Sequence, residues 1–458
     1  MKFVFSSFKS IRIMYTRNDI ITEERLSELE RIREQKREER FAALVPKMGE
    51  AAVDEVRKIY KMFTIDMLIW YAGLWEPEIG GFYFSNSARD HEGFLPDLES
   101  TSQAVGFITA MCALGDDDKD TYILPWPKRF QEKISNFAYN LQDEDGYFYH
   151  PQWGKEISPT RRGRDCGWAW RLIEPLGKKC KYLRPTQRAK QEGTPPPTFP
   201  DYLQSTDALR EWLSTRDIEH NSYPFGNLIN STGGQFVAAG DEYVKILVDY
   251  LNSHNREDNG LWEPQVNYAS VNGLMKLGMV YPGLNGATLP HPDKSFESAV
   301  AAVVSDEEVT FACQFYNAWA ATQACLRSME LEGDKEKAEK YRARLREVAP
   351  EMIRVTGEKI ALTAVGDGSF AYFTAASGKT CPHSQGAWVA LHGVREGDVN
   401  GNGCSTRAPL RHMFKAFGVD MPPFFTEEDA EFFFELLDAR VPVPKKPNPE
   451  LEKEKQEV

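Results

Sequence analysis

The sequence lacks any apolar run close to the roughly 18 residues that a membrane-spanning helix needs, because polar residues or glycine interrupt its longest hydrophobic stretches. It also lacks a CxxC pair, and its seven cysteines are scattered, which disfavours a disulfide scaffold and a zinc site. GxSxG, Walker A, HExxH and GxGxxG strings are all missing, so the common signatures of hydrolases, P-loop enzymes and dinucleotide-binding proteins are absent. We therefore predict no membrane span, no metal and no cofactor.

The N-terminal residues 1–14 place three basic residues among apolar ones, without an uninterrupted apolar core or a small-residue cleavage site. A secretory signal peptide is therefore not predicted. Scattered, unpaired cysteines are typical of proteins in a reducing compartment. We expect the protein to be cytoplasmic.

The formal net charge of −13 would repel nucleic acid and anionic membranes. An anionic partner therefore requires a local basic patch, and residues 155–190 provide one: eleven Lys and Arg stand against three Asp and Glu, a net charge of +8. Tryptophans such as Trp153 and Trp168 are interleaved with this patch. Arginine binds carboxylate or sulfate groups in a bidentate manner, so an acidic glycan is a better fit than nucleic acid, for which no motif is present. A solvated surface run would have the same composition.

Composition divides the 458 residues into three parts. Residues 22–40 are charge-dense and rich in helix formers, which predicts an exposed helix within an N-terminal helical arm, 1–59. Residues 441–458 are rich in proline and charge and have no apolar period, which predicts a disordered tail. The domain between them spans 60–440.

Within this domain most segments place apolar residues at i, i+3, i+4 and i+7, and strand-like alternation is scarce. A turn followed by aromatic residues recurs at 80–84, 143–153, 257–264 and 366–373. Glycine supplies the positive φ of such a turn, and the aromatic ring fills the layer beneath it. The pattern predicts an all-α fold.

The segment Gln142-Asp143-Glu144-Asp145-Gly146-Tyr147-Phe148 resembles the Q…DG-aromatic repeat of the alpha-alpha toroid superfamily. The rhythm of helices and turns over about residues 60–420 is similar to that of the same group, which includes terpene cyclases, protein prenyltransferases and polysaccharide lyases. The resemblance implies an (α/α) toroid or barrel of about six helical hairpins, whose inner helices present their N-terminal ends to a central cleft. It implies a fold and not a reaction.

The first candidate segment is 81–103. Asn86 and Arg89 lie in a polar loop, and Glu99 and Gln103 fall on one face of the following helix. This arrangement fits a substrate-binding edge. The alternative is that Asp97 and Glu99 favour the positive helix N-terminus and that Arg89 pairs with one of them.

The second candidate segment, 220–235, contains His220, Asn221 and Asn227 among further Asn, Ser, Thr and Gln residues. Burying unpaired amides costs about 1–3 kcal/mol each, so their density favours a wall that binds a polar ligand. Glycines in the same segment would allow helices or substrate to approach closely. The alternative is an exposed loop with local hydrogen bonds.

The third segment, 257–276, places Tyr268, Asn272 and Lys276 at successive i+4 steps on one helix face. A tyrosine can act as a proton shuttle if a neighbouring cation lowers its pKa from about 10. The alternative is a buried tyrosine whose hydroxyl is satisfied by Asn272.

Two strings resemble metal motifs. Residues 398–403 match the first half of a calcium loop, but Pro409 stands where the bidentate glutamate should be. Residues 116–120 satisfy the DDxxD spacing of class I terpene synthases, in what is more simply an acidic turn. We assign neither to a metal.

His291 and His383 lie on loops bounded by proline or glycine, where a lone histidine is usually solvated.

We predict a polysaccharide or oligosaccharide lyase that cleaves a uronic-acid-containing glycan by β-elimination, a reaction that needs a group to offset the carboxylate, a base and an acid. The predicted catalytic residues are Tyr268 as base and acid, His220, Asn221 and Asn227 beside the carboxylate, and Glu99. The predicted substrate-binding residues are Asn86, Arg89, Gln103, Arg161, Arg164, Trp168, Asn272, Lys276 and His383. One rival is a glycoside hydrolase or sugar epimerase that uses Asp97, Glu99 and Glu263. Another is a toroid that binds glycans without catalysis.

Overall fold

The computed structural model describes residues 20–115, 122–192, 200–377, 383–384 and 387–456. Its described part is predominantly helical, and its strands are two-residue antiparallel pairs. β1(Trp75–Glu76) pairs with β2(Gly81–Phe82), and β3(His383–Ser384) pairs with β4(Ala387–Trp388). The all-α prediction is confirmed. No helix in these ranges is long and apolar enough to cross a membrane.

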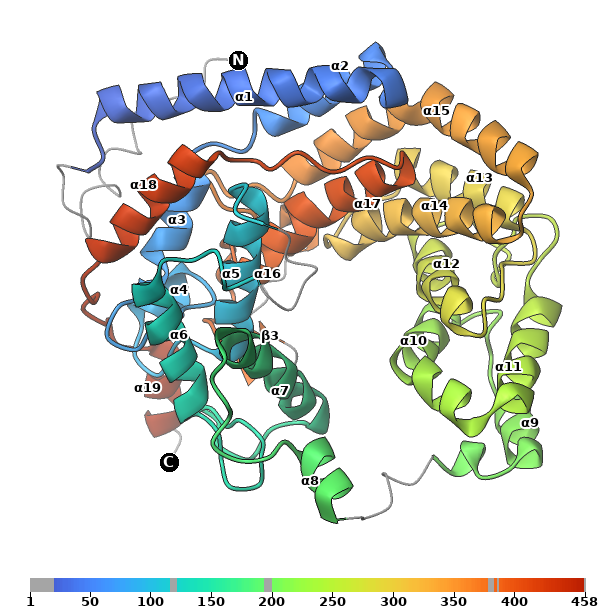
Figure 1. Ribbon diagram of the computed structural model, residues 1–458, viewed down its shortest axis with the longest axis horizontal. Coiled ribbons are helices and arrows are strands. Elements are labelled where there is room, and N and C mark those ends of the chain that lie inside the picture. The colour runs from blue at the N-terminus through green and yellow to red at the C-terminus, as the bar shows by residue number, and fades with distance from the viewer. Residues whose placement is uncertain (1–19, 116–121, 193–199, 378–382, 385–386, 457–458) are drawn as a thin grey trace.

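Figure 1 shows the helices in their order along the chain. They are α1(Glu23–Met48), α2(Glu50–Tyr60), α3(Asp66–Gly73), α4(Asn86–Asp90), α5(Leu98–Met111), α6(Lys128–Asn140), α7(Pro159–Ile173), α8(Pro185–Glu192), α9(Thr206–Ser214), α10(Ser222–Ala239), α11(Asp241–His254), α12(Tyr268–Val280), α13(Pro292–Val304), α14(Cys313–Leu331), α15(Lys335–Ala361), α16(Val399–Asn402), α17(Ala408–Ala416), α18(Glu427–Asp438) and α19(Pro449–Gln456). Short 3₁₀ turns are η2(Glu174–Leu176), η3(Asp201–Leu203), η4(Tyr281–Gly283) and η5(Ala375–Ser377), and η6(Gly403–Arg407) is a π-helical turn.

The helices pack in two layers (Figure 1). In the first layer, α10 packs against α12, α12 against α14 and α14 against α17, while α5 packs against α7 and α16. In the second layer, α6 covers α7, α11 covers α10, and α13 and α15 cover α14. Between α7 and α10 the chain runs outward through α8 and α9, at the bottom of the view.

The predicted turns have the backbone that their sequence requires. Each has a glycine at positive φ two residues before a buried aromatic ring, and backbone bridges close the turns at Gln142–Phe148 and Ala364–Phe370. A side chain at these φ values would strain the backbone. The pairs are Gly80 (φ 85°) with Phe82, Gly146 (φ 89°) with Phe148, Gly260 (φ 68°) with Trp262, and Gly368 (φ 89°) with Phe370. The aromatic rings therefore lie in the core below the turns, as predicted.

The N-terminal arm packs on the domain, with α1 against α18 and α2 against α15. Two arginines of α1 are buried although the sequence predicted an exposed helix. Arg33 donates to Asp429 at 2.9 Å, and Arg37 donates to the backbone carbonyls of Phe63 and Phe424 at 2.8 and 2.6 Å. These bonds offset the cost of removing two cations from water.

The C-terminal residues also differ from the expectation of a disordered tail. Described residues 441–456 lie against the segment that follows α4 and end in α19. The Lys445 ammonium donates to the carbonyl of Ala88 at 3.1 Å, and the buried Asn448 side chain donates to the carbonyl of Glu92 at 3.0 Å. The composition of this segment predicted disorder because it has no apolar period. It could not predict these hydrogen bonds, because the backbone carbonyls that accept them leave no signal in the sequence.

Removing Arg33 should destabilise the protein, because Asp429 would then stay buried with its charge uncompensated. The two side chains are 4% and 0% exposed, and breaking such a buried pair costs about 3–5 kcal/mol. We expect Arg33→Ala to lower the urea midpoint accordingly, measured by circular dichroism.

Arg31→Ala is the matched control on the same helix. Arg31 pairs with Glu28, and their side chains are 62% and 56% exposed. Exposed pairs contribute little, so its urea midpoint should stay close to that of the parent protein. Equal losses in the two variants would contradict the assigned role of Arg33.

Candidate active site

Helix α5 begins at Leu98 because Asp97 caps it. The Asp97 carboxylate accepts the backbone N–H groups of Glu99 and Ser100 at 3.0 and 3.1 Å. A carboxylate in this position satisfies amides that have no partner within the helix and faces the positive end of the helix dipole. The helix-terminus interpretation of Asp97 is therefore confirmed.

Arg161 of α7 is fully buried and joins α7 to the start of α5. Its guanidinium group donates to Asp97 at 2.8 Å and to Asp165 at 2.9 Å, and it lies 3.3 Å from Glu99. Three carboxylates thus surround one buried cation. Burial raises the pKa of Asp165 to about 7, Arg161 opposes the rise, and Asp97 adds to it.

Glu99, two residues after Asp97 in the first turn of α5, belongs to the same cluster and contacts two further side chains. Its Oε1 accepts a hydrogen bond from Gln103 Nε2 at 3.0 Å and one from Arg164 at 3.0 Å. The guanidinium group of Arg164 lies 5.8 Å from the ring centroid of Trp168. The structure therefore brings Glu99 and Gln103 of the first candidate segment together with Arg161, Arg164 and Trp168 of the basic patch.

A second group of polar side chains lies where α10, α12 and α14 pack together. The ammonium group of Lys276 is 6.0 Å from the ring centroid of Tyr223. On α14, the Cys313 thiol lies 2.8 Å from the hydroxyl of Tyr372 and 3.5 Å from that of Tyr316. Each helix supplies one or two members of the group, as an active site assembled from several elements does.

The close approach of α10 and α12 sets the contact between Tyr223 and Lys276. Gly226, one turn after Tyr223, faces Lys276 so closely that a Cβ at Gly226 would lie 2.9 Å from the Cβ of Lys276. The expectation that a glycine of this segment permits close helix approach is confirmed.

The environment shifts the pKa values of this group in opposite directions. Burial lowers the pKa of Lys276, and the nearby Arg164 lowers it further, while Cys313 opposes the shift. Burial raises the pKa of Tyr223, and Cys313 adds to that rise. Burial and Cys313 raise the pKa of Tyr372 as well. A lysine whose pKa is lowered thus lies beside a tyrosine whose pKa is raised, and environments that push two pKa values apart are common in pairs of acids and bases.

A cavity of about 360 Å³ adjoins these groups and is lined by arginines from three elements. Arg171 belongs to α7, Arg407 to η6 and Arg411 to α17, and Gln103 and Trp168 complete the wall beside Asn400 and Cys404. Cys404 is an electrostatic neighbour of Tyr316 and Tyr372. We call this space the arginine cavity.

Arg407 lies in the π-helical turn η6, which directly follows the short helix α16. The Asp398 carboxylate accepts the backbone N–H of Gly401 at 2.5 Å and that of Tyr372 at 3.1 Å. It therefore caps α16, and the π-helical turn that follows is a feature often found at functional sites. Among the described residues, no group of three His, Cys, Asp or Glu side chains could hold a metal ion.

Several residues proposed from the sequence lie elsewhere. Asn86 and Arg89 bond to each other at 2.9 Å, and Arg89 pairs with Asp90 rather than with Asp97 or Glu99. The proposed pairing of Arg89 with the helix start is therefore wrong. Both residues belong to α4, and the Asn86 side chain donates a hydrogen bond to the Asp367 carboxylate at 3.3 Å.

The amide-rich segment does not form a buried ligand wall. His220, Asn221 and Asn227 are exposed, and the first two bond to Asp217 at 2.8 and 3.3 Å. These residues match the second interpretation of the segment, an exposed stretch with local hydrogen bonds. The same segment supplies Tyr223 to the candidate site.

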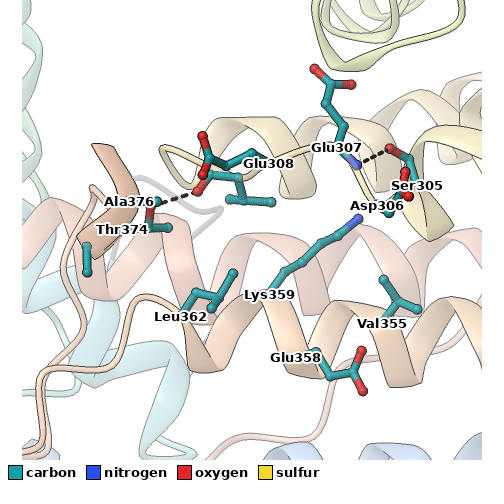
Figure 2. A pocket seen from close by; sticks show the side chains of 12 residues that line it. Ser305, Asp306, Glu307, Glu308, Val355, Glu358, Lys359, Leu362, Thr374 and Ala376 are labelled. Atoms are coloured by element: carbon teal, nitrogen blue, oxygen red, sulfur yellow. Dashed lines mark hydrogen bonds between the residues drawn. The ribbon is translucent and has the colours of Figure 1, made fainter. Parts of the chain in front are cut away.

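Tyr268 is fully buried, and two of its neighbours, Glu307 and Lys359, line a different cavity of about 430 Å³. Its backbone N–H donates to Glu307 at 2.9 Å, and Lys359 lies 5.0 Å from its ring centroid. Figure 2 shows Lys359 reaching toward the loop of Asp306 and Glu307. Acidic residues line this cavity, and burial raises the pKa of Tyr268, so Tyr268 is poorly placed as a base for an anionic substrate.

Asn272 is buried, and no hydrogen bond joins it to the Tyr268 hydroxyl in the described part of the chain. His291 precedes α13, where its carbonyl accepts the N–H of Ser295 at 2.9 Å. The side chain of His383 and residues 116–120 lie outside the described residues.

Sequence reasoning counted Tyr223 only among the polar residues of segment 220–235, without a role of its own. It missed Cys313, Tyr372 and the two arginines of the η6–α17 segment. Arg407 and Arg411 are spaced i, i+4 and therefore share a helix face, which was a usable signal. Cys313 and Tyr372 had none, because they meet only through tertiary packing.

No family model, curated protein or solved structure matches this chain.

The stability of the buried cluster should depend on pH through Asp165. Its folded pKa of about 7 exceeds the ordinary value of 3.8, so the folded state binds the proton more tightly than the unfolded state. Stability should therefore fall as pH rises from about 4 to about 7 and level off above that. We expect Asp165→Asn to remove part of this slope in urea midpoints measured at pH 4.5 to 8.

Asp258→Asn is the control, because Asp258 is an exposed acid paired with Arg256. Its curve should run parallel to that of the parent protein. If the Asp165→Asn curve were also parallel, Asp165 would not hold a proton in the folded state.

Proposed function

We propose that this protein is an (α/α) toroid enzyme that cleaves an acidic oligosaccharide or polysaccharide by β-elimination at a uronic acid. The toroid is supported by the succession of first-layer contacts from α10 through α12 and α14 to α17, and by those of α5 with α7 and α16. A second layer backs them. The recurring glycine and aromatic turns also fit this architecture.

The observation that carries the proposal is the contact of Lys276 with Tyr223 beside Arg164. The ammonium group of Lys276 lies 6.0 Å from the Tyr223 ring centroid, and Arg164 is close enough to lower the pKa of Lys276. β-Elimination needs a base, an acid and a cation that offsets the uronate carboxylate. These three side chains supply the three roles.

In the proposed reaction, Arg164 binds the carboxylate and makes the adjacent C5 proton more acidic. The neutral amine of Lys276 takes that proton, and the C5 electron pair forms the C4–C5 double bond as the C4–O bond breaks. The Tyr223 hydroxyl protonates the leaving oxygen. Its raised pKa keeps Tyr223 in the protonated form that an acid needs.

Glu99 supports this arrangement as a positioning residue. It holds Arg164 at 3.0 Å and is itself held beside Arg161. A guanidinium group fixed in this way binds a carboxylate without first having to be ordered. Glu99 is therefore assigned a role through Arg164 and not a role as catalytic acid.

The hydrolase alternative is less well supported. Asp97 and Glu99 are engaged by arginines, while Glu263 accepts the backbone N–H and the hydroxyl of Ser222 at the start of α10. A glycosidase pair needs two carboxyl groups that face one sugar ring.

We expect Lys276→Met and Tyr223→Phe each to reduce elimination by about 100-fold or more, because each removes a proton-transfer group. The assay follows near-ultraviolet absorbance of the unsaturated product on a panel of uronic-acid oligosaccharides. In the parent protein the rate should rise with pH, with a midpoint below the ordinary lysine value of 10.5, because only the neutral amine accepts a proton.

Lys245→Met is the matched control, since Lys245 is an exposed lysine of α11 paired with Asp249. It should keep the parent rate. Loss of activity in Tyr268→Phe but not in Tyr223→Phe would return the base to Tyr268. New reducing ends without absorbance would indicate hydrolysis, and binding without either product would indicate a non-catalytic protein.

A further inference from the structure

Helix α10 has an exposed face without any charged residue. None of its 18 residues is Asp, Glu, Lys, Arg or His, although 27% of the whole chain is charged. The adjacent helix α11 differs, because its exposed residues include Asp241, Lys245 and Asp249. Charged side chains usually cover the solvent face of a surface helix. Contact with water alone therefore does not account for the uncharged face of α10.

This face begins at Tyr223, the proposed acid. Four residues of α10 are spaced by four, three and four positions, which places them on one side of the helix. They are Tyr223, Asn227, Asn230 and Gly234, and we call them the α10 row. Tyr223 is half-buried, and the other three are exposed. At about 1.5 Å per residue the row is about 16 Å long, which is longer than one sugar ring.

The two amides of the row are available to a ligand. In the part of the chain that the structure describes, no hydrogen bond engages the side chain of Asn227 or Asn230. His220 and Asn221, which precede the helix, bond instead to Asp217. An amide side chain offers two donors and one acceptor. These groups complement sugar hydroxyls, which both donate and accept hydrogen bonds.

Gly234 keeps part of the row bare without a reason in the packing. A Cβ at Gly226 would lie 2.9 Å from that of Lys276, so helix packing explains Gly226. A Cβ at Gly234 would meet no neighbouring atom within 4 Å. Glycine is unfavourable within a helix. Its presence where packing does not require it indicates that a ligand approaches the backbone at this point.

We propose that the α10 row binds uncharged sugar units on the leaving-group side of the cleaved bond. The acid Tyr223 lies beside the leaving oxygen, so the glycan continues from Tyr223 along Asn227 and Asn230 past Gly234. This inference rests on the proposed function for the position of the cleaved bond. It narrows the substrate class to glycans in which uncharged sugars, and not further uronic acids, precede the uronate. The row itself contains no cation that would bind a further carboxylate.

Substitutions in the row test this assignment with a tetrasaccharide in which three uncharged hexoses precede one uronic acid. Binding is measured by isothermal calorimetry in the Lys276→Met background, which should bind the substrate without cleaving it. Gly234→Leu covers the row and should weaken binding at least about tenfold. Its melting temperature should stay equal or rise, because leucine is the better helix former. Asn227→Ala and Asn230→Ala should each weaken binding about fivefold, because each removes hydrogen bonds to the sugar.

Two matched controls lie outside the row. Asn140→Ala removes an exposed amide from the end of α6, and Ser253→Leu adds a leucine to an exposed position of α11. In the same background, both should bind the tetrasaccharide as Lys276→Met alone does. An all-uronate tetrasaccharide should bind at least about tenfold more weakly than the one with three uncharged hexoses.

Unchanged affinity in Gly234→Leu and in the double variant of Asn227 and Asn230, or no binding at all, would overturn the subsite. Equal binding of the all-uronate tetrasaccharide would contradict the narrowed substrate class. A parent protein that sediments as a dimer, which Gly234→Leu dissociates, would assign this face to a second copy of the chain instead. Binding that depends on the row, without unsaturated product from the parent protein, would reject the proposed reaction and keep the subsite.

Discussion

The buried guanidinium group of Arg161 is the interaction on which the candidate site depends. It joins α7 to the N-terminus of α5 by contacts with Asp97, Glu99 and Asp165. Without this cation, three carboxylates would lie buried beside one another, which costs several kcal/mol per uncompensated charge. Arg161, together with the Arg164–Glu99 bond, thus joins the two helices that present Gln103, Arg164, Trp168 and Arg171.

Charge is sorted by location in this protein. The chain is acidic overall, yet Arg171, Arg407 and Arg411 meet at one cavity. A separate cavity beside Lys359 is bordered by acidic residues (Figure 2). The acidic residues around this second cavity make the nearby Tyr268 an unfavourable base for an anionic substrate.

Local patterns predicted the fold better than the site. Glycine turns before Phe148 and Trp262 were readable because φ and ring burial are local requirements. Glu99 and Gln103 were placed on one helix face because i, i+4 spacing fixes it. The sequence predicted a ligand-binding role for His220, which is exposed, and disorder for the segment of Lys445, which bonds to a backbone carbonyl. Composition shows how polar a segment is, but not whether its side chains contact solvent or backbone groups of the protein.

The sequence by itself determined that the chain is helical, where its turns lie and which residues share a helix face. These properties depend on backbone geometry within a few residues. Tertiary structure alone decided that Tyr223 meets Lys276, that Cys313 meets Tyr372, and that arginines from α7, η6 and α17 line one cavity. The physical reason is that a 3.6-residue period fixes a face but not what the face contacts. That choice is made by the packing of distant helices.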